Sequence, residues 1–300
     1  AISSFSTYLE SSVKMRLRSD VELGTSLSGG LDRSSIAAII DRQFPQHGPL
    51  KTFSAVFPGF KKDESRYVNT VINKFGFTND TTTPTVDKLI ADFEKVCYHQ
   101  EEPFSSSSIF AQFSVYETAK NKGVKVLLDG QGADEILAGY EKYIHWHLQH
   151  LYTKGGSGML NKEIKHIQDK NISFNWGIKN YLAAIFPSHT TVLLEKIESN
   201  KAFVHPDINK KFIQAVYGKE LQGINKPIVT KLNDILYYNV MQLGLEELLR
   251  FADRNSMAHS VEVRLPFLQH KLVEFVFSLP SGYKIHDGWT KWILRKATEK

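Results

Sequence analysis

The feature that most constrains the fold is the alternation of apolar strand-like runs with amphipathic segments over the first half of the chain. The run Val124–Leu128 (VKVLL) is continuously apolar, as in a parallel sheet that is covered on both faces. Further strands are predicted at 21–27 and 52–57, a strand with a loop at 77–83, and helices at 2–17, 64–75, 85–99 and 108–121. Strands that alternate with helices in this way predict an α/β fold with a doubly wound parallel sheet.

Beyond Tyr140 the strand signals stop, and most of the remaining sequence is predicted to be helical. The stretch 154–159 (KGGSGM) is expected to be a turn or exposed loop, and helices are predicted at 160–167, 212–222 and 234–259. We therefore predict an α/β core over 1–145 and a mainly helical lobe over 146–300. The last helix-like segment, 290–300, has no stop signal, so the chain is interpreted as truncated at its C-terminus.

Charge and composition exclude several classes of protein. The net charge of +5 comes without a dense basic run or a stacking motif, so we expect a polyanionic small ligand rather than nucleic acid. The single cysteine, Cys97, cannot form an internal disulfide, and a cytoplasmic protein is expected. No apolar run approaches the roughly 18 residues that span a membrane.

A glycine-rich segment, Ser28–Asp32 (SGGLD), lies between the first strand and the next helix. Its glycines let the backbone turn sharply, and the unpaired N–H groups at the start of a helix attract anions. Ser28 adds a hydroxyl donor. Asp32 would repel phosphates unless it binds Mg²⁺, which bridges phosphate oxygens. The segment differs from a Walker A loop because it lacks the lysine. A plain Ser-Gly-Gly turn is the alternative.

A second turn with two glycines and flanking acids, 129–135 (DGQGADE), follows the strand VKVLL. Loops at the carboxyl ends of parallel strands converge on one crevice, so Asp32 and Asp134 are predicted to lie on either side of one Mg²⁺ ion. An ordinary turn with Asp134 as a helix N-cap is the alternative.

Near the C-terminus, the segment 253–268 (DRNSMAHSVEVRLPFL) mixes polar with large apolar residues. Its polar groups must therefore be buried and paired, or face a site. Arg254 and Arg264 are candidates for phosphate or carboxylate contact, because a guanidinium group matches both anions. A structural ion pair is the alternative for each. A fourth short motif is KWILR at 291–295.

Taken in order, these four motifs resemble those of the asparagine synthetases, whose synthetase domain belongs to the N-type ATP pyrophosphatases. SGGLD resembles the PP-loop SGGxDS, with Arg33 where serine is usual. The second motif resembles (S/D)GxG(A/S)DExxxGY, with Gln131 where glutamate or aspartate is frequent. The third and fourth resemble DRxSMAxSxExRxPFLD, with Gln269 for the last residue, and KxxLR. The resemblance covers essentially residues 1–300.

The resemblance implies an ATP- and Mg²⁺-dependent ligase. It would convert aspartate into a β-aspartyl-adenylate with release of pyrophosphate, and ammonia would then displace AMP to give asparagine. The implied nucleotide-binding residues are Leu27, Ser28, Gly29, Gly30, Asp32, Ser34, Ala55, Asp129 and Gly130. The implied metal ligands are Asp32 and Asp134. The implied catalytic residues are Lys291, which would stabilise the leaving pyrophosphate, Gln131 and Arg254.

The partners expected from this resemblance are ATP, aspartate or another small carboxylate, and ammonia. Glutamine-dependent members begin with a glutaminase domain whose first residue is a nucleophilic cysteine, whereas this chain begins with Ala1. We therefore expect the glutaminase domain to be absent, and a homodimer is also considered.

Two alternatives to this function remain open. One is a ligase for another carboxylate, in β-lactam or macrolactam formation or in metabolite or glycan amidation. The other is a non-catalytic nucleotide-binding homologue.

Overall fold

The computed structural model describes residues 1–43, 45, 49–61, 63–104, 106–193, 207, 209–216 and 227–299. The chain forms two compact units that interleave along the sequence. Unit 1 contains Ala1–Ala133, Glu246–Val276 and Leu294–Lys300. Unit 2 contains Asp134–Leu245 and Phe277–Ile293. The first boundary lies close to the predicted one at residue 145, but two later segments of the predicted helical lobe return to unit 1.

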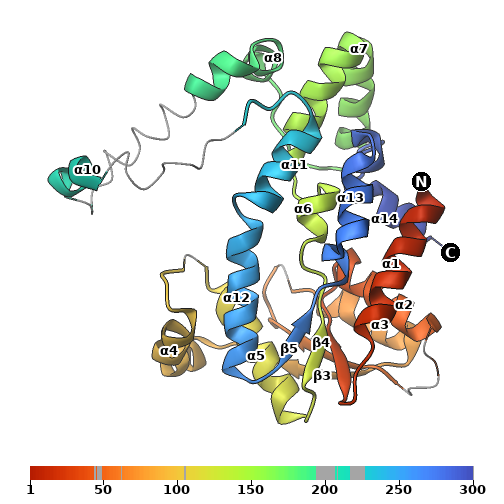
Figure 1. Ribbon diagram of the computed structural model, residues 1–300, viewed down its shortest axis with the longest axis vertical. Coiled ribbons are helices and arrows are strands. Elements are labelled where there is room, and N and C mark those ends of the chain that lie inside the picture. Colours follow the sequence, from red (N-terminus) through yellow and green to blue (C-terminus); the bar gives the residue numbers. More distant parts are fainter. Residues whose placement is uncertain are drawn as a thin grey trace. The chain divides into compact units, whose positions relative to one another are not determined.

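Five strands form the sheet at the centre of unit 1 (Figure 1). They are β1 (Leu23–Ser26), β2 (Lys51–Ala55), β3 (Thr78–Thr82), β4 (Val126–Leu128) and β5 (Glu262–Arg264). Their order is β3-β2-β1-β4-β5, and all neighbouring pairs are parallel. The chain first builds outward from β1 to β3 and then returns to the other side of β1 for β4. The predicted α/β fold with a doubly wound parallel sheet is confirmed.

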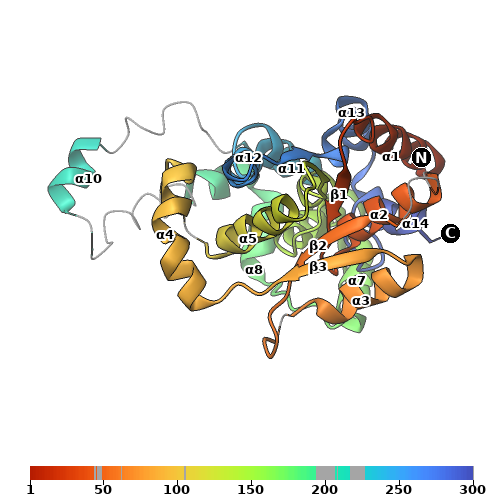
Figure 2. The same cartoon turned by 90° about the horizontal axis from the view of Figure 1, so that it is seen from below.

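Helices pack on this sheet through separate apolar clusters. The α-helices of unit 1 are α1 (Ile2–Arg16), α2 (Leu31–Gln43), α3 (Ser65–Phe75), α4 (Val86–Gln100), α5 (Ser108–Asn121), and most of α12 (Leu245–Ala258), α13 (His270–Ser278) and α14 (Trp292–Ala297). Tyr116 and Ala119 of α5 pack with Phe53 of β2. Ala37 of α2 and Val68 of α3 belong to a second cluster. Figure 2 shows α4 beside α5, and β1, β2 and β3 next to one another.

The predicted strands at 21–27, 52–57 and 124–128 correspond to β1, β2 and β4, and β3 lies in the segment 77–83. The four helices predicted in the first half are also confirmed. Strand β5 was not predicted, because its three residues, EVR, offer no apolar run. Its pairing with β4 brings the segment 246–276 into unit 1, which explains why the division at 145 and the observed units differ.

Unit 2 is helical and has its own core. Its helices are α6 (Ala133–Leu137, which starts at the last residue of unit 1), α7 (Lys142–Asp169), α8 (Ile178–Ile185), α10 (Lys210–Val216) and α11 (Leu232–Met241). Buried side chains such as Tyr143, Leu148 and Leu236 form one cluster. The turn predicted at 154–159 is present at Gly156, whose non-helical φ of 65° and ψ of −161° divide α7 into two helices across a kink. Residues 154–159 are exposed, and helix continues on both sides of the kink.

The prediction of a single helix over 234–259 was wrong. The structure has α11 and α12 there, and they are separated near Gly244, whose φ of 107° is outside helical geometry. The predicted helix 212–222 overlaps α10, and its residues 217–222 lie outside the described part of the chain. The final helix-like segment contains α14 (Trp292–Ala297).

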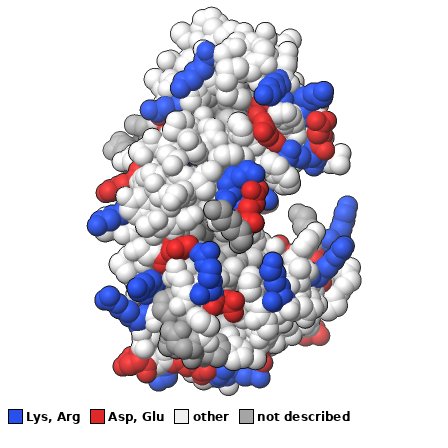
Figure 3. All heavy atoms as spheres, turned by 90° about the vertical axis from the view of Figure 1, so that its right-hand side faces the viewer, with Lys and Arg blue, Asp and Glu red and all other residues white. Residues whose placement is uncertain are grey.

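Among the described residues, no helix combines the length and the apolar character needed to cross a membrane. On the face shown in Figure 3, basic and acidic side chains lie close to one another, so positive charge is locally offset there.

Candidate nucleotide-binding site

A cavity of about 400 Å³ lies in unit 1 at the carboxyl ends of β1, β2 and β4. It is lined by Ser26, Leu27, Ser28, Arg33, Phe53, Ala55, Phe57, Glu64, Ser108, Ile109, Ala111, Gln112, Val115, Tyr116, Asp129, Gln131, Leu248 and Phe251. In an open parallel sheet, ligands bind outside the carboxyl ends of the strands where the strand order reverses, here between β1 and β4. The volume is typical of small-molecule sites, which range over roughly 300–1,000 Å³.

The turn that follows β1 is held by close packing and by short-range hydrogen bonds. Gly29 lies against Tyr67 of α3, and a Cβ atom at position 29 would overlap the tyrosine side chain. The N–H of Gly30 donates to Ser28 Oγ at 3.4 Å, and Ser34 Oγ donates to the carbonyl of Gly30 at 2.9 Å. Ser28 lines the cavity, whereas Ser34 does not. The Ser34 hydroxyl therefore links the first turn of α2 to the glycine turn before it.

Arg33, which occupies the usual serine position of the PP-loop pattern, is paired with Asp129. Arg33 Nε lies 2.7 Å from Asp129 Oδ1, and Nη2 lies 3.4 Å from Oδ2. Asp129 Oδ1 also accepts the N–H of Gly130 at 2.6 Å. Burial works against the charged guanidinium, but the Asp129 carboxylate outweighs it and raises the pKa of Arg33. Because the two side chains are 29% and 1% exposed, the arginine shields a buried carboxylate and still borders the cavity.

Three buried polar atoms of the cavity wall have no hydrogen-bond partner in the described structure. They are Ser26 Oγ, at the end of β1, the hydroxyl oxygen of Tyr116, on α5, and Gln131 Oε1, in the loop after β4. Buried polar groups are nearly always paired, so unpaired atoms of this kind indicate a polar ligand. Ser28 and Arg33 add further polar groups to the cavity lining.

Apolar side chains also line the cavity. They are Ile109 and Val115 of α5, Leu248 and Phe251 of α12, and Ala55 of β2, and Glu64, Ser108 and Gln112 line it as well. Val115 is 7% exposed and Phe251 8%, so these side chains offer a preformed apolar surface. A cavity with both polar and apolar lining residues fits an amphipathic ligand such as a nucleotide.

In unit 2, the second half of the motif 129–140 forms an ion pair with the predicted catalytic lysine. Lys291 Nζ lies 2.7 Å from Asp134 Oδ1, and Lys291 is only 8% exposed. A Cβ atom on Gly139 would overlap both the Asp134 carboxylate and Lys291 Cε. The glycine of the motif is therefore required by the close approach of these two charged groups.

The neighbouring acid, Glu135, has a different partner. The hydroxyl of Tyr140 donates to Glu135 Oε1 at 2.6 Å. Burial raises the pKa of Glu135, and burial together with the Glu135 carboxylate raises the pKa of Tyr140. Tyr140, the last residue of the motif, thus holds the Glu135 carboxylate in place, while Asp134 pairs with Lys291.

The predicted Mg²⁺ ligands belong to different units. Asp32 lies in the first turn of α2 in unit 1, and Asp134 lies in unit 2. Gly130 packs directly against Asp32, because a Cβ atom there would lie 2.9 Å from Asp32 Cβ. Carboxylate oxygens have the right chemistry for Mg²⁺, so both residues fit the ion. Their sharing of one ion stays a prediction.

The two arginines of the third motif make structural contacts. Arg254 Nη2 lies 2.7 Å from Glu101, with both side chains largely exposed, and Arg254 does not line the cavity. Arg264 Nη1 donates to the carbonyls of Arg16 and Arg18, both at 2.7 Å, and Nε donates to Glu262 at 2.6 Å. These contacts join α1 and the segment after it to β5. They match the structural alternative stated for each arginine.

Of the nucleotide-binding residues predicted from the sequence, Leu27, Ser28, Ala55 and Asp129 line the cavity, as does Gln131. Gly29, Gly30, Asp32, Ser34 and Gly130 do not line it and instead shape the two turns beside it. Sequence reasoning missed Ser26 as a wall residue and Gly139 as a spacer. The position of Ser26 at the end of the first strand was the available signal for it.

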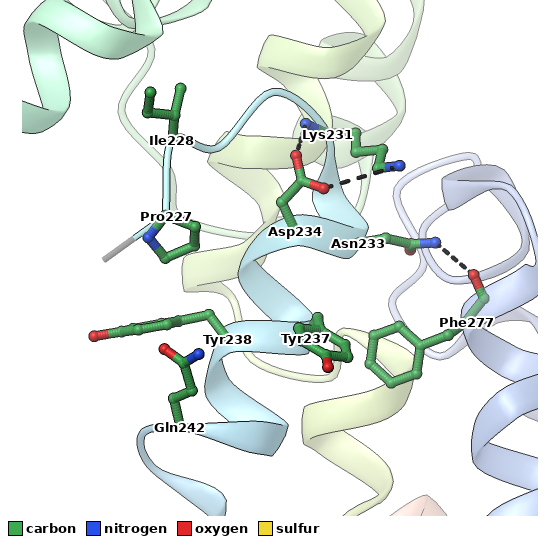
Figure 4. Close-up of a pocket in the computed structure, with 9 residues that line it drawn as sticks. All are labelled: Pro227, Ile228, Lys231, Asn233, Asp234, Tyr237, Tyr238, Gln242 and Phe277. Atoms are coloured by element: carbon green, nitrogen blue, oxygen red, sulfur yellow. Dashed lines mark hydrogen bonds and ion pairs between the residues drawn. The ribbon is translucent and has the colours of Figure 1, made fainter. Parts of the chain in front are cut away.

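A second cavity, of about 530 Å³, lies in unit 2 beside α11 (Figure 4). Its charged side chains form contacts at the start of α11. Asp234 accepts the N–H groups of Thr230 and Lys231 at 3.0 Å, and Asn233 donates to the carbonyl of Phe277 at 2.9 Å. Figure 4 shows Tyr237 close to Phe277, whose ring centroid is 6.0 Å away. Among the described residues that line this cavity, only Asn233 has a buried polar atom without a hydrogen-bond partner, its Oδ1, whereas the cavity of unit 1 has several such residues.

A parallel sheet with a ligand-sized cavity at the carboxyl ends of its strands defines the class of open α/β folds that bind ligands at a reversal of strand order. Comparison with known proteins identifies the family. The asparagine synthase family model matches residues 4–300, so the chain belongs to the asparagine synthase family.

Individual relatives are similar over most of this chain. Asparagine synthetase (glutamine-hydrolyzing) 1 of Bacillus subtilis is 27% identical over 296 residues, which cover 96% of this chain and 45% of the relative. A putative asparagine synthetase (glutamine-hydrolyzing) of Mycobacterium tuberculosis is 26% identical over 97% of this chain and 44% of the relative. Amidase chry2 of Gibberella zeae is 23% identical over 96% of this chain and 48% of the relative. The chain thus spans less than half the length of these curated relatives.

Proposed function

We propose that the chain activates a carboxylate with ATP and passes it to a nitrogen nucleophile. A carboxylate oxygen attacks the α-phosphorus of ATP, the bond from that phosphorus to the bridging oxygen breaks, and pyrophosphate leaves. An amine then attacks the acyl carbon, loses a proton, and AMP leaves with the former carboxylate oxygen. In the preferred form the acid is aspartate, the nucleophile is ammonia from a glutaminase domain, and the product is asparagine.

The observation that carries this proposal is the cavity of unit 1, whose lining combines the unpaired Ser26 Oγ and Gln131 Oε1 with apolar side chains. The adenine ring would lie between α5 and α12, near Ala55. The phosphates would lie at the turn after β1, where Ser28 supplies a hydroxyl and the start of α2 supplies N–H groups. Arg33 adds guanidinium N–H groups to the cavity wall, with its charge balanced by Asp129. No side-chain nucleophile is needed, because alignment and charge stabilisation account for such a reaction.

The family resemblance implies further charged groups. Lys291 would stabilise the charge that develops on pyrophosphate, and Asp134 keeps the ammonium group in position through their 2.7 Å ion pair. Asp32 and Asp134 would hold Mg²⁺, which neutralises phosphate charge when bound. Gln131 would hydrogen-bond the reacting groups. Arg254 lies in the family motif but contacts Glu101, so we assign it a positioning role.

The test is ATP/pyrophosphate exchange with Mg²⁺ and aspartate, measured on the parent chain and on Asp32→Ala. Asp41→Ala is the matched control, because Asp41 lies on the same helix and does not line the cavity. Exchange that requires aspartate and is lost in Asp32→Ala, but not in the control, supports the proposal. ATP binding without exchange for any acid would refute it and favour a non-catalytic nucleotide-binding protein.

A ligase for another carboxylate is the second candidate. A relative named an amidase, at 23% identity, is about as similar to this chain as the asparagine synthetases are. Exchange with another acid from a panel, and none with aspartate, would select this function. The acyl-adenylate step is the same for both functions.

A further inference from the structure

Unit 2 contains a cluster of three potential metal ligands that the proposed reaction does not use. Glu163 and His166 lie three residues apart on α7, and therefore on the same face of the helix. Asp287 lies in a loop from the C-terminal part of the unit. One ligand atom from each residue lies within 4.8 Å of the other two.

Asp287 is presented by a tight two-residue hairpin. The flanking residues exchange backbone hydrogen bonds of 3.0 and 2.9 Å, and Asp287 and Gly288 both have positive φ, at 47° and 72°. This is the geometry of a type I′ turn, for which Asp-Gly is a favoured sequence. Gly288 lies directly on α7. Its N–H donates to Glu163 Oε1 at 2.8 Å, and a Cβ atom there would be 2.6 Å from the carbonyl oxygen of His166. The hairpin therefore holds Asp287 beside the helix.

The geometry between His166 and Asp287 is that of two ligands directed at one point. Nδ1 of His166 and Oδ1 of Asp287 are 2.9 Å apart, yet Nδ1 is buried and has no hydrogen bond of acceptable geometry. Ligand atoms that surround a tetrahedral zinc ion at roughly 2.0–2.2 Å lie roughly 3.3 Å from one another. A close approach without a hydrogen bond is therefore expected for shared coordination.

The charges in the cluster also call for a cation. Glu163 is 7% exposed. Among the described residues, the ion-pair partners of Glu163 and Asp287 are histidines, and no lysine or arginine pairs with either carboxylate. His147 Nε2 faces Glu163 at 3.9 Å, and this imidazole is only 2% exposed with its Nδ1 unpartnered. A buried carboxylate without a permanent cation is costly, and a bound metal ion removes that cost.

We propose that Glu163, His166 and Asp287 bind one divalent transition-metal ion of the zinc class. An imidazole nitrogen with two carboxylate oxygens suits zinc, whereas Mg²⁺ and Ca²⁺ prefer oxygen ligands alone. The ion joins α7 to the hairpin. Because Lys291 follows Gly288 by only three residues, the ion also steadies the segment that carries Lys291. The site does not depend on the proposed function.

The test is a zinc titration of the chelator-treated full chain by calorimetry, in the presence of excess Mg²⁺. We expect one saturable site that is at least about tenfold weaker in His166→Gln and in Asp287→Asn. The control is His189→Gln, an exposed histidine of unit 2 outside the cluster, which should keep the parent affinity. A hundredfold excess of zinc over its Kd should raise the Tm of the parent by roughly 5 °C or more. Co²⁺ in place of zinc should give visible absorption bands that the two variants lose.

Equal zinc affinity in the parent, both variants and the control would mean an adventitious ion only and would overturn the proposal. Absence of saturable binding to the parent would overturn it as well. If His166→Gln does not fold, Asp287→Asn decides the matter, because the Asp287 side chain is half-exposed and asparagine keeps its shape and its turn preference.

Discussion

The pair formed by Arg33 and Asp129 gives the sharpest test of the structure, through the substitution Arg33→Ser. Removing one partner of a buried ion pair costs roughly 3–5 kcal/mol, because the other charge is left buried and unpaired. Asp129 is 1% exposed, but it keeps the N–H of Gly130, and Arg33 is partly exposed. We therefore expect the lower end of the range, about 3 kcal/mol, or a fall in Tm of roughly 6–12 °C.

The assay is thermal unfolding followed by far-UV circular dichroism. All four tryptophans, Trp146, Trp176, Trp289 and Trp292, belong to unit 2, so tryptophan fluorescence provides a second signal that does not originate in unit 1. The matched control is Arg42→Ser. Arg42 lies on the same helix and pairs with Glu10 at the surface, where an ion pair contributes only about 0–1 kcal/mol.

The double variant Arg33→Ser/Asp129→Ser removes both charges and should be less destabilised than the sum of the single variants by more than about 1 kcal/mol. The reasoning is refuted if Arg33→Ser unfolds at the same temperature as Arg42→Ser. Strict additivity of the two single substitutions would refute it too, because groups that do not interact have additive effects.

Three other outcomes follow from single positions. Gly139→Ala should lower pyrophosphate exchange by roughly tenfold or more while the fold is retained, because the added methyl group displaces Asp134 and Lys291 from each other; an unchanged rate would contradict the role of that ion pair. Gly158→Ala, inside α7 and with open space around the new Cβ, should stabilise unit 2 by about 0.5–1 kcal/mol in fluorescence-detected unfolding. Burial lowers the pKa of Lys284 from 10.5 to about 7. The folded state therefore binds fewer protons than the unfolded chain between these values, and stability should rise from pH 7 to pH 9 in the parent, but not in Lys284→Met.

Much of unit 1 could be predicted from the sequence because its elements are encoded locally. The strands at 52–57 and 124–128 are apolar runs, and the helices beside them are bounded by turn residues. Strand β5 could not be predicted, because it exists only through its pairing with β4, far away in the sequence. The turn at Gly156 could be predicted, because glycine lowers local helix propensity. Burial of residues on both sides of it, such as Leu148 and Leu160, keeps the two parts of α7 helical.

In the candidate site, too, the features that could be predicted are those encoded by local sequence. The sequence located the two glycine-rich turns, because a glycine between a strand and a helix is a local signal. It could not show that Gly29 is required by Tyr67, or Gly139 by the ion pair of Asp134 and Lys291, since both requirements come from the approach of other segments.

The role of the unusual residue Arg33 becomes clear from its ion pair with Asp129. A large cation inside the proposed phosphate-binding turn would fill the place of the nucleotide if its side chain pointed across the turn. Instead, Arg33 extends along the buried carboxylate of Asp129, and the cavity beside it remains open at about 400 Å³. The charges of the pair cancel, and the pair places guanidinium N–H groups in the wall of the cavity. Arg33 is therefore better understood as the partner of Asp129, a residue that the family pattern allows, than as a defect at one position. Restoring serine at position 33 alone should weaken nucleotide binding, and only the double substitution Arg33→Ser/Asp129→Ser should recover it.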